Sequence, residues 1–190
     1  GGGGAGGGGG PRRPLIGRGS AAAFWRPQPS GGLATGAMTQ FLGTHFGKLD
    51  RKGRISVPAP FRSALQRFGS DILILRPSHR LPCIEVHPES EFQRLTSGLQ
   101  QLDAFSDQQD DLATALFTEA HALQPDGEGR LVLPEPLVAH AGLTDAVACL
   151  GLGSMFQIWE PEAAKRRIAE ARMRVRERGM TLPAPPPSAP

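Results

Sequence analysis

Two short stretches of the sequence each place an arginine four residues after an aspartate, with a glycine directly before the arginine. Residues 49–61 read LDRKGRISVPAPF, and residues 125–137 read PDGEGRLVLPEPL. An aspartate ahead of a tight turn can accept backbone N–H bonds, and the arginine can reach the same carboxylate and fix the shape of the loop. Glycine supplies the backbone freedom that such a turn requires. The residues expected to structure the two loops are Asp50, Gly53, Asp126 and Gly129.

The tips of the two loops differ in charge. Arg51 and Lys52 add two cations to the first loop, whereas the second has Gly127 and Glu128 at these places. We therefore expect the first loop to attract phosphate, and the second to do so much less unless its arginine projects past Glu128. Arginine suits bidentate contact with a phosphate, and lysine suits a phosphate as a point charge. The candidate residues for contact with an anionic partner are Arg51, Lys52, Arg54 and Arg130, with Arg62, Arg67 and Arg76 as weaker candidates that could simply be solvated.

The remaining charges are also distributed in blocks, which the net charge of +3 conceals. Residues 45–80 hold eight Lys and Arg against two acids, and residues 164–179 hold seven against two. Residues 81–163 between them hold two Arg against fourteen acids. Partners sense local potential over about one Debye length, so these basic blocks predict an anionic partner.

The two loops belong to a longer internal duplication. Val57-Pro58 matches Leu133-Pro134, and farther along CIEVHPE (residues 83–89) parallels FQIWEPE (residues 156–162). One copy alone has about four short strands with open edges, and two copies related by a pseudo-twofold axis could close those edges and bury a shared core. We therefore predict a mainly β fold of two similar half-units with attached helices.

The apolar patterns and turn residues place the individual elements. Ser106 is expected to cap the third helix, whose apolar stripe continues to Leu123. The predicted strands are residues 45–49, 54–57, 72–75, 83–86, 146–150 and 156–159, and the predicted helices are residues 60–68, 88–95, 106–123 and 161–178. Cys83 and Cys149 lie in strand-like apolar runs without metal-ligand spacing, so we expect them to be buried.

The two ends of the sequence do not have the composition of a packed domain. Residues 1–37 are Gly-rich and are expected to be a disordered extension, with Met38 as the natural start. A basic arm that touches nucleic acid is the alternative, and it would use Arg12, Arg13, Arg18 and Arg26. Residues 180–190 form a Pro-rich tail expected to stay extended. The extension lacks a secretory signal and no apolar run approaches a membrane span, which favours a cytoplasmic location.

Four segments together closely resemble the MraZ family of bacterial transcriptional regulators, which have two SpoVT-AbrB-type domains. The resemblance covers residues 38–175 and is carried by FLGTHFGKLDRKGRISVPAPFRSAL, DGEGRLVLPEPLVAHAGL, IEVHPESEF and FQIWEPEAA. It implies one SpoVT-AbrB domain over residues 44–91, a helical connector over residues 92–119, and a second domain over residues 120–163. A basic C-terminal helix follows over residues 164–179. The residues that match the family motif are Asp50, Arg54, Asp126 and Arg130.

The resemblance also implies a fold and a function. The two halves would form a swapped-hairpin-like β-barrel, and the chains would assemble into homo-oligomeric rings. Such rings would bind short direct repeats in double-stranded DNA upstream of the division and cell-wall gene cluster, as a nucleoid-associated regulator that is usually a repressor. Residues 1–37 have no counterpart in the family pattern. Glu128 departs from a DNA-facing loop, so equal contact by both loops is not expected.

Two features leave alternatives open. The basic C-terminal helix has Ile168, Arg172 and Val175 on one face, so it could dock against a neighbouring subunit, lie along DNA or bind another partner. The acidic segment DQQDDL could engage a basic protein, as in an antitoxin-type interaction module that does not bind an operator.

Catalysis is not expected. The sequence has neither a GxxxxGK[ST] nor a GxSxG motif, and its five histidines show no HExxH or paired metal spacing. We therefore expect no enzyme activity, cofactor, metal or small-molecule substrate.

Overall fold

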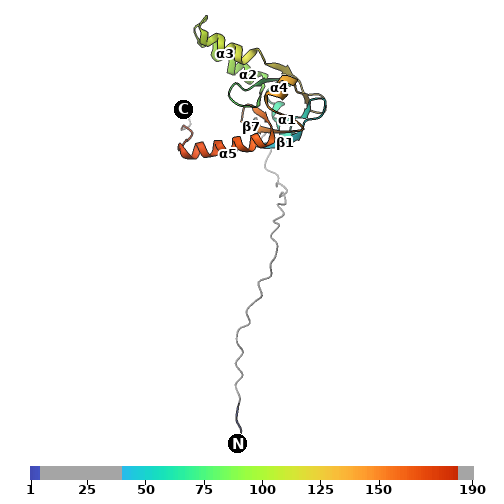
Figure 1. The fold of residues 1–190 in the computed structure, drawn as a ribbon, viewed down its shortest axis with the longest axis vertical. Coiled ribbons are helices and arrows are strands. Elements are labelled where there is room, and N and C mark those ends of the chain that lie inside the picture. The colour runs from blue at the N-terminus through green and yellow to red at the C-terminus, as the bar shows by residue number, and fades with distance from the viewer. Residues whose placement is uncertain (5–39, 184–190) are drawn as a thin grey trace, which may run out of the picture. The chain divides into compact units, whose positions relative to one another are not determined.

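The computed structural model describes residues 1–4 and 40–183 of the 190-residue chain (Figure 1). Almost all of the Gly-rich extension expected over residues 1–37, including the alternative basic arm, lies outside the described residues. The same holds for most of the Pro-rich tail. The part that carries both loops runs from Phe41 to the end of the C-terminal helix.

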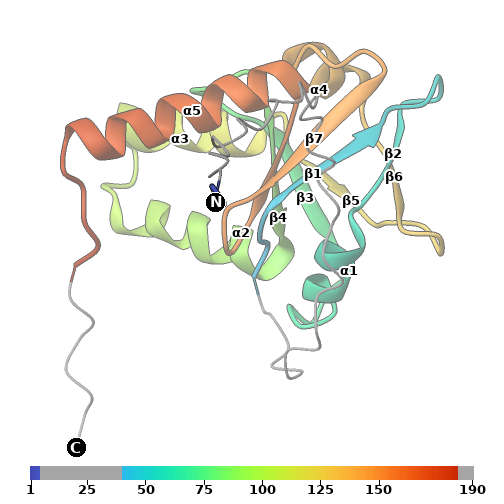
Figure 2. The same ribbon diagram turned by 90° about the horizontal axis from the view of Figure 1, so that it is seen from below.

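Six antiparallel strands form the main sheet, in the order β1-β7-β8-β4-β3-β5. Hydrogen bonds therefore join strands from the two halves of the sequence at several places. Figure 2 shows this sheet with the β2–β6 pair beside it. The strands of the main sheet are β1 (Thr44–Lys48), β3 (Leu73–Pro77), β4 (Ile84–Pro88), β5 (His121–Leu123), β7 (Ala146–Gly151) and β8 (Phe156–Trp159).

The strand order has the symmetry of the sequence duplication. In the alignment of the two halves, β1 corresponds to β5, β3 to β7, and β4 to β8. Replacing each strand by its counterpart reverses the order and returns the same sheet. The halves also exchange strands, because β1 pairs with β7 of the second half and β5 pairs with β3 of the first. This arrangement accords with the predicted pseudo-twofold relation.

A separate two-stranded ribbon carries the duplicated loops. It joins β2 (Arg54–Ser56) to β6 (Arg130–Val132), with Ile55 directly opposite Leu131. These two residues are counterparts in the duplication, so the symmetry axis passes through their pair. One further bond at each end extends the ladder, from Val57 N–H to Gly129 O at 2.9 Å and from Leu133 N–H to Gly53 O at 2.8 Å. Each loop is thereby bonded to the strand of the other half.

The sheet-and-helix character is confirmed, but the prediction of a closed barrel is wrong. The main sheet is open, with β1 and β5 at its edges, and the ribbon is a sheet of its own. β1 and β2 form no ladder across the first loop, which is closed by the bond from Asp50 N–H to Arg54 O at 3.0 Å. Pro58 and Pro134 follow the ribbon strands, and because proline has no N–H the ladder stops there. The ribbon is therefore too short to continue the main sheet into a barrel.

The main core lies between the ribbon and one face of the sheet. Alternate residues of β8, Phe156 and Ile158, face this core together with Ile55 and Leu131 of the ribbon. Two short equivalent helices complete it, α1 (Ala59–Leu65) with buried Phe61 and α4 (Glu135–His140) with buried Leu137. Burial of this apolar surface is the main force that holds the ribbon in place.

The opposite face of the sheet packs a second apolar cluster. Helix α5 (Pro161–Glu177) places Ala164 against Cys83, Ala148 and Trp159. Cys83 and Cys149 are both buried and free, as expected, and burial raises the pKa of each thiol to about 12. The remaining helical segments are α2 (Glu89–Thr96), η1 (Ser97–Gln101) and α3 (Asp107–Phe117). None of the helices in the described ranges is both long and apolar enough to cross a membrane.

The prediction for the third helix is half right. Ser106 caps α3, because its Oγ accepts the N–H of Gln109 at 3.2 Å. The expected continuation to Leu123 is wrong, since α3 ends at Phe117 and His121–Leu123 form strand β5. Pairing with β3 places Leu123 opposite Leu73, so a tertiary contact overrides the local helical pattern.

The central pair of the ribbon gives a direct test of this architecture. Leu131→Ala should lower the free energy of unfolding by about 2–5 kcal/mol, because a fully buried side chain is lost from both the core and the ribbon. The neighbouring Val132 is 59% exposed, and Val132→Ala should change stability by less than about 1 kcal/mol. Urea denaturation followed by circular dichroism measures both. Similar losses for the two variants would contradict the burial of Leu131.

Candidate nucleic-acid interface

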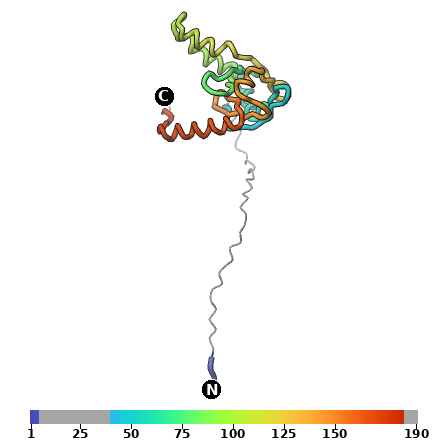
Figure 3. Tube along the Cα trace, in the orientation of Figure 1, coloured from blue at the N-terminus to red at the C-terminus, as the bar shows by residue number. Residues whose placement is uncertain are grey.

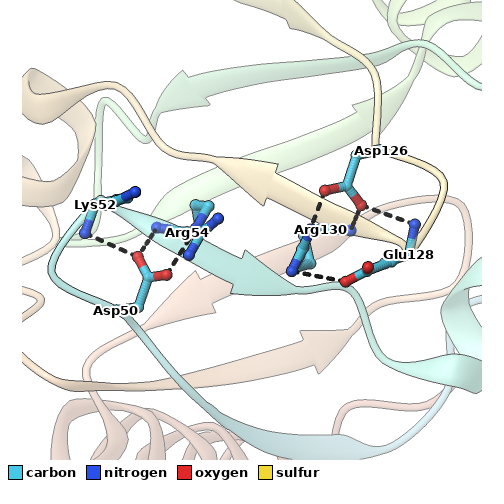
Figure 4. A network of polar contacts seen from close by, with 6 residues as sticks. All are labelled: Asp50, Lys52, Arg54, Asp126, Glu128 and Arg130. Atoms are coloured by element: carbon cyan, nitrogen blue, oxygen red, sulfur yellow. Dashed lines mark hydrogen bonds and ion pairs between the residues drawn. The ribbon is translucent and has the colours of Figure 1, made fainter.

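The first loop is organised around the carboxylate of Asp50. Its Oδ1 accepts the backbone N–H groups of Lys52 and Arg54, both at 2.9 Å. Its Oδ2 accepts Nε–H of the Arg54 side chain at 2.7 Å (Figure 4). Gly53 adopts a φ of 72°, which favours glycine. Asp50 thus fixes both the backbone of the loop and the direction of its arginine.

The second loop repeats the same bonding. Asp126 Oδ1 accepts the N–H groups of Glu128 and Arg130, both at 2.9 Å, and Oδ2 accepts Arg130 Nε–H at 2.9 Å. Gly129 has a φ of 75°. The duplicated residues therefore produce two geometrically equivalent loops at the two ends of the ribbon (Figure 4).

Hydrogen bonding lowers the pKa of both aspartates below the ordinary value of 3.8. For Asp50 the largest cause is the backbone N–H of Arg54, followed by the opposing effect of burial and then by the Arg54 side chain. For Asp126 the backbone N–H and then the side chain of Arg130 are the largest causes. Both carboxylates remain charged at neutral pH, so each loop keeps its ion pair under physiological conditions.

The two loop arginines project from the exposed face of the ribbon. Because residues of a strand alternate between faces, Arg54 and Ser56 lie on one face and buried Ile55 on the other. Arg130 and Val132 occupy the same exposed face from the opposite strand. The ribbon thus presents both arginines on one surface.

The tips of the loops differ in their charge partners. Arg51 and Lys52 are exposed, and across residues 40–183 no carboxylate lies within 4.0 Å of either side chain. In the second loop, Glu128 Oε2 pairs with Arg130 Nη1 at 2.6 Å. The first tip is therefore an uncompensated group of cations, and the second is compensated.

Arg62 lies against the second loop. A Cβ on Gly129 would collide with the Arg62 side chain, and Arg62 Nη1 donates to Val57 O at 2.8 Å. The same arginine lines a groove of about 530 Å³ beside Asp126 and Glu128. Arg62 therefore buttresses the ribbon from α1, a contact between the halves that sequence spacing does not reveal.

Arg76, one of the weaker candidates, is not available to a polyanion. It is 3% exposed and pairs with Glu85 across the β3–β4 ladder. Burial would raise the pKa of Glu85, but the neighbouring His87, whose Nε2 lies 3.7 Å from Oε2, together with Ser78 and the charge of Arg76 lowers it to about 2. Sequence reasoning missed this buried ionic cluster, whose only signal was a charged residue within each of two apolar strands.

The apolar side chains of helix α5 that pack against the sheet, Ala163, Ala164 and Ile168, lie in its first half. Glu160 caps it by accepting the N–H groups of Glu162 at 2.9 Å and Ala163 at 2.7 Å. Of the face expected to dock, Ile168 packs on the sheet, whereas Val175 is 48% exposed. In Figure 3 the red tube of this helix extends away from the rest of the described fold toward its C-terminal end. Its cations are thus presented to solvent.

No group of three or more histidine, cysteine or acidic side chains in the described residues is placed to hold a metal ion. The surface that the structure does assemble is the ribbon with its two loops.

Comparison with known proteins identifies the family. The sequence model described as "MraZ protein, putative antitoxin-like" matches residues 40–114 and 116–179, which is more than half of the chain. The chain belongs to the MraZ family. A protein named transcriptional regulator MraZ from Gluconacetobacter diazotrophicus is 53% identical over 150 residues, covering 77% of this chain and 94% of its own. The MraZ resemblance carried by the two loops and the strand–helix joints is confirmed.

Other MraZ relatives agree with this assignment. The protein of the same name from Gluconobacter oxydans is 49% identical over 142 residues, covering 73% of this chain and 87% of its own. The protein of that name from Xanthobacter autotrophicus is 41% identical over 140 residues, covering 74% of this chain and 89% of its own.

The loop geometry predicts the titration of its aspartates. By carboxyl NMR, Asp50 and Asp126 should titrate below 3.8. Because each pKa is lower in the folded than in the unfolded state, the carboxylates contribute stability above the unfolded pKa. That contribution is lost as the pH falls through the folded pKa. Arg54→Ala should raise the pKa of Asp50 only partway, since the backbone N–H at position 54 remains. An unchanged Asp50 pKa in this variant would contradict the side-chain bond.

Proposed function

We propose that this chain is a transcriptional regulator that binds double-stranded DNA through the loops of its ribbon, chiefly through the first. The observation that carries the proposal is the cationic tip formed by Arg51, Lys52 and Arg54. The first loop presents this tip, and within residues 40–183 no carboxylate compensates Arg51 or Lys52. The relatives are named transcriptional regulator MraZ, and this name supports the same function.

The chemistry of the tip suits a nucleic acid. Arg54 is bonded to Asp50 through Nε, and among the described residues no acceptor bonds the two terminal nitrogens of its guanidinium. They match the paired acceptors of a guanine edge or of a phosphate. Arg51 and Lys52 beside it suit phosphates, which fix the position of a protein on the duplex. In this proposal Asp50 and Gly53, like Asp126 and Gly129, shape the loops.

A single loop is a weak binder, so we propose that several copies act together. A homo-oligomeric ring would present the loops at fixed spacing and gain affinity by avidity, which favours short direct repeats as the operator. The proposed operator lies upstream of the division and cell-wall gene cluster, where the protein would act as a repressor associated with the nucleoid. The exposed half of α5 supplies a surface for a neighbouring copy.

An antitoxin-type interaction module is the second candidate. It is favoured by the antitoxin-like description of the family and by α3, which exposes Asp107, Asp110 and Asp111. An electrophoretic mobility shift with the DNA upstream of the gene separates the two candidates, because only the regulator binds it.

Replacing the first-loop arginine tests the proposed interface. A bidentate base contact contributes about 1–3 kcal/mol per site, and a ring multiplies the loss, so Arg54→Ala should abolish detectable binding to the upstream duplex. Fluorescence anisotropy measures the affinity and light scattering the oligomer size, which should not change. Arg94→Ala is the matched control, since Arg94 is an exposed arginine whose side chain pairs with Glu91 on α2. Binding that survives Arg54→Ala would refute the proposal.

The affinity should also depend steeply on salt. The logarithm of the association constant should fall with the logarithm of salt concentration with a slope near −0.9 for each phosphate neutralised. Arg94→Ala should keep the wild-type slope, and Lys52→Ala should make it shallower. A flat salt dependence would contradict phosphate contact.

Truncation of the C-terminal helix tests its role in assembly. A chain ending at Ala171 keeps the contacts of Ala164 and Ile168 with the sheet, so the fold should remain. If the exposed half of α5 docks against a neighbour, light scattering should show a smaller assembly, and DNA affinity should fall through lost avidity. A full-sized assembly with reduced affinity would instead place this half of the helix on DNA.

A further inference from the structure

The two loop arginines are bonded differently despite their equivalent positions. Arg54 donates through Nε to Asp50 at 2.7 Å, and no acceptor among the described residues bonds its Nη1 or Nη2. Arg130 donates through Nε to Asp126 at 2.9 Å, and its Nη1 also pairs with Glu128 at 2.6 Å. Figure 4 shows both sets of contacts.

This difference decides which guanidinium edge is available. Bidentate contact with a guanine or a phosphate needs two neighbouring nitrogens that donate in the same direction. Since Nε is held by an aspartate in both loops, the remaining pair is Nη1 and Nη2. Arg54 offers that pair. In Arg130 the Glu128 carboxylate already lies against Nη1, so that edge is partly covered and its charge is compensated.

Glu128 also reverses the charge of the tip. In the duplication it corresponds to Lys52, so the second loop has an anion where the first has a cation. The Glu128 side chain is 71% exposed, and an exposed ion pair of this kind contributes little to stability. Its main effect is therefore on what can approach Arg130.

We propose that Glu128 masks Arg130 from nucleic acid, so that each subunit presents one competent loop, the first. This inference rests on the proposed DNA-binding function and adds the residue that makes the two loops unequal. The carboxylate lies against Nη1 and places negative charge where a phosphate would otherwise lie.

Removing the carboxylate while keeping the shape of the side chain tests this directly. Glu128→Gln should raise the affinity of the full chain for a fluorescein-labelled upstream duplex by roughly fivefold to tenfold for each subunit that engages the duplex, as each gains one charge-assisted contact. The salt slope should steepen by about 0.9 for each engaged subunit if that contact is to a phosphate. Glu135→Gln is the matched control, because Glu135 is exposed on α4 and has no ion-pair partner in the described part of the chain. Its gain should be less than about twofold, from long-range charge alone.

Arg130→Ala, alone and combined with Glu128→Gln, tests whether Arg130 is the group that Glu128 masks. Arg130→Ala should change wild-type affinity by less than about twofold, since the arginine is already masked. In the Glu128→Gln background the same replacement should remove the gain, and circular dichroism checks that each variant is folded. Equal gains in Glu128→Gln and Glu135→Gln would overturn the inference, as would a loss in Arg130→Ala as large as that in Arg54→Ala. Wild-type binding that survives Arg54→Ala overturns the proposed function instead, and with it the premise of this inference.

Discussion

The pairing of Ile55 with Leu131 is the contact on which the two loops depend. These residues are counterparts in the duplication, lie directly opposite each other in the ribbon, and are both buried. The ladder around them is short, so its backbone bonds alone would hold it weakly. Burial of its apolar side chains against one face of the main sheet stabilises the ribbon. The carbonyls of Gly53 and Gly129 accept the hydrogen bonds that end the ladder on each side. The position of each loop is therefore set by the half of the chain to which it does not belong.

The aspartates act on a smaller scale. Asp50 and Asp126 satisfy two backbone N–H groups each and hold the Nε of an arginine, so the arginine leaves the ribbon in a fixed direction. Exposed ion pairs contribute little to global stability, and their value here is geometric. The same scaffold can thus present different surfaces, because in the described residues the ion pairs of the tip side chains are confined to that of Glu128 with Arg130, which is exposed. Charge at the tip positions can therefore change with little effect on the fold.

Much of the fold could be predicted from the sequence, because duplication and apolar periodicity are local signals. Most strand and helix positions follow from these signals, and so does the cap at Ser106. Partners within one half, β3 with β4 and β7 with β8, follow from their adjacency in the sequence. Partners between the halves could not be predicted, because β1 and β2 are adjacent in sequence but pair with β7 and β6. The wrong expectation of a closed barrel came from the family resemblance, and the wrong expectation of a helix through residues 118–123 arose because the pairing of β5 with β3 is not visible in the local pattern. Arg76 looked like a surface cation because its partner, Glu85, lies on another strand. The loop geometry was easier, because its bonds join residues at most four apart.

The difference in charge between the tips of the first and second loops gives the subunit a direction. A dimer of identical chains has a true twofold axis, which makes its two ends equivalent and matches inverted, palindromic sites. In this chain the twofold axis is only approximate, because the two halves differ in sequence. Position 52 is lysine, and the equivalent position 128 is glutamate. The two ends of the ribbon in one subunit are therefore distinguishable, and in the proposed complex with DNA they would give the subunit an orientation along the duplex. Neighbours that all face one way around an assembly would meet sequence elements that are repeated in the same orientation.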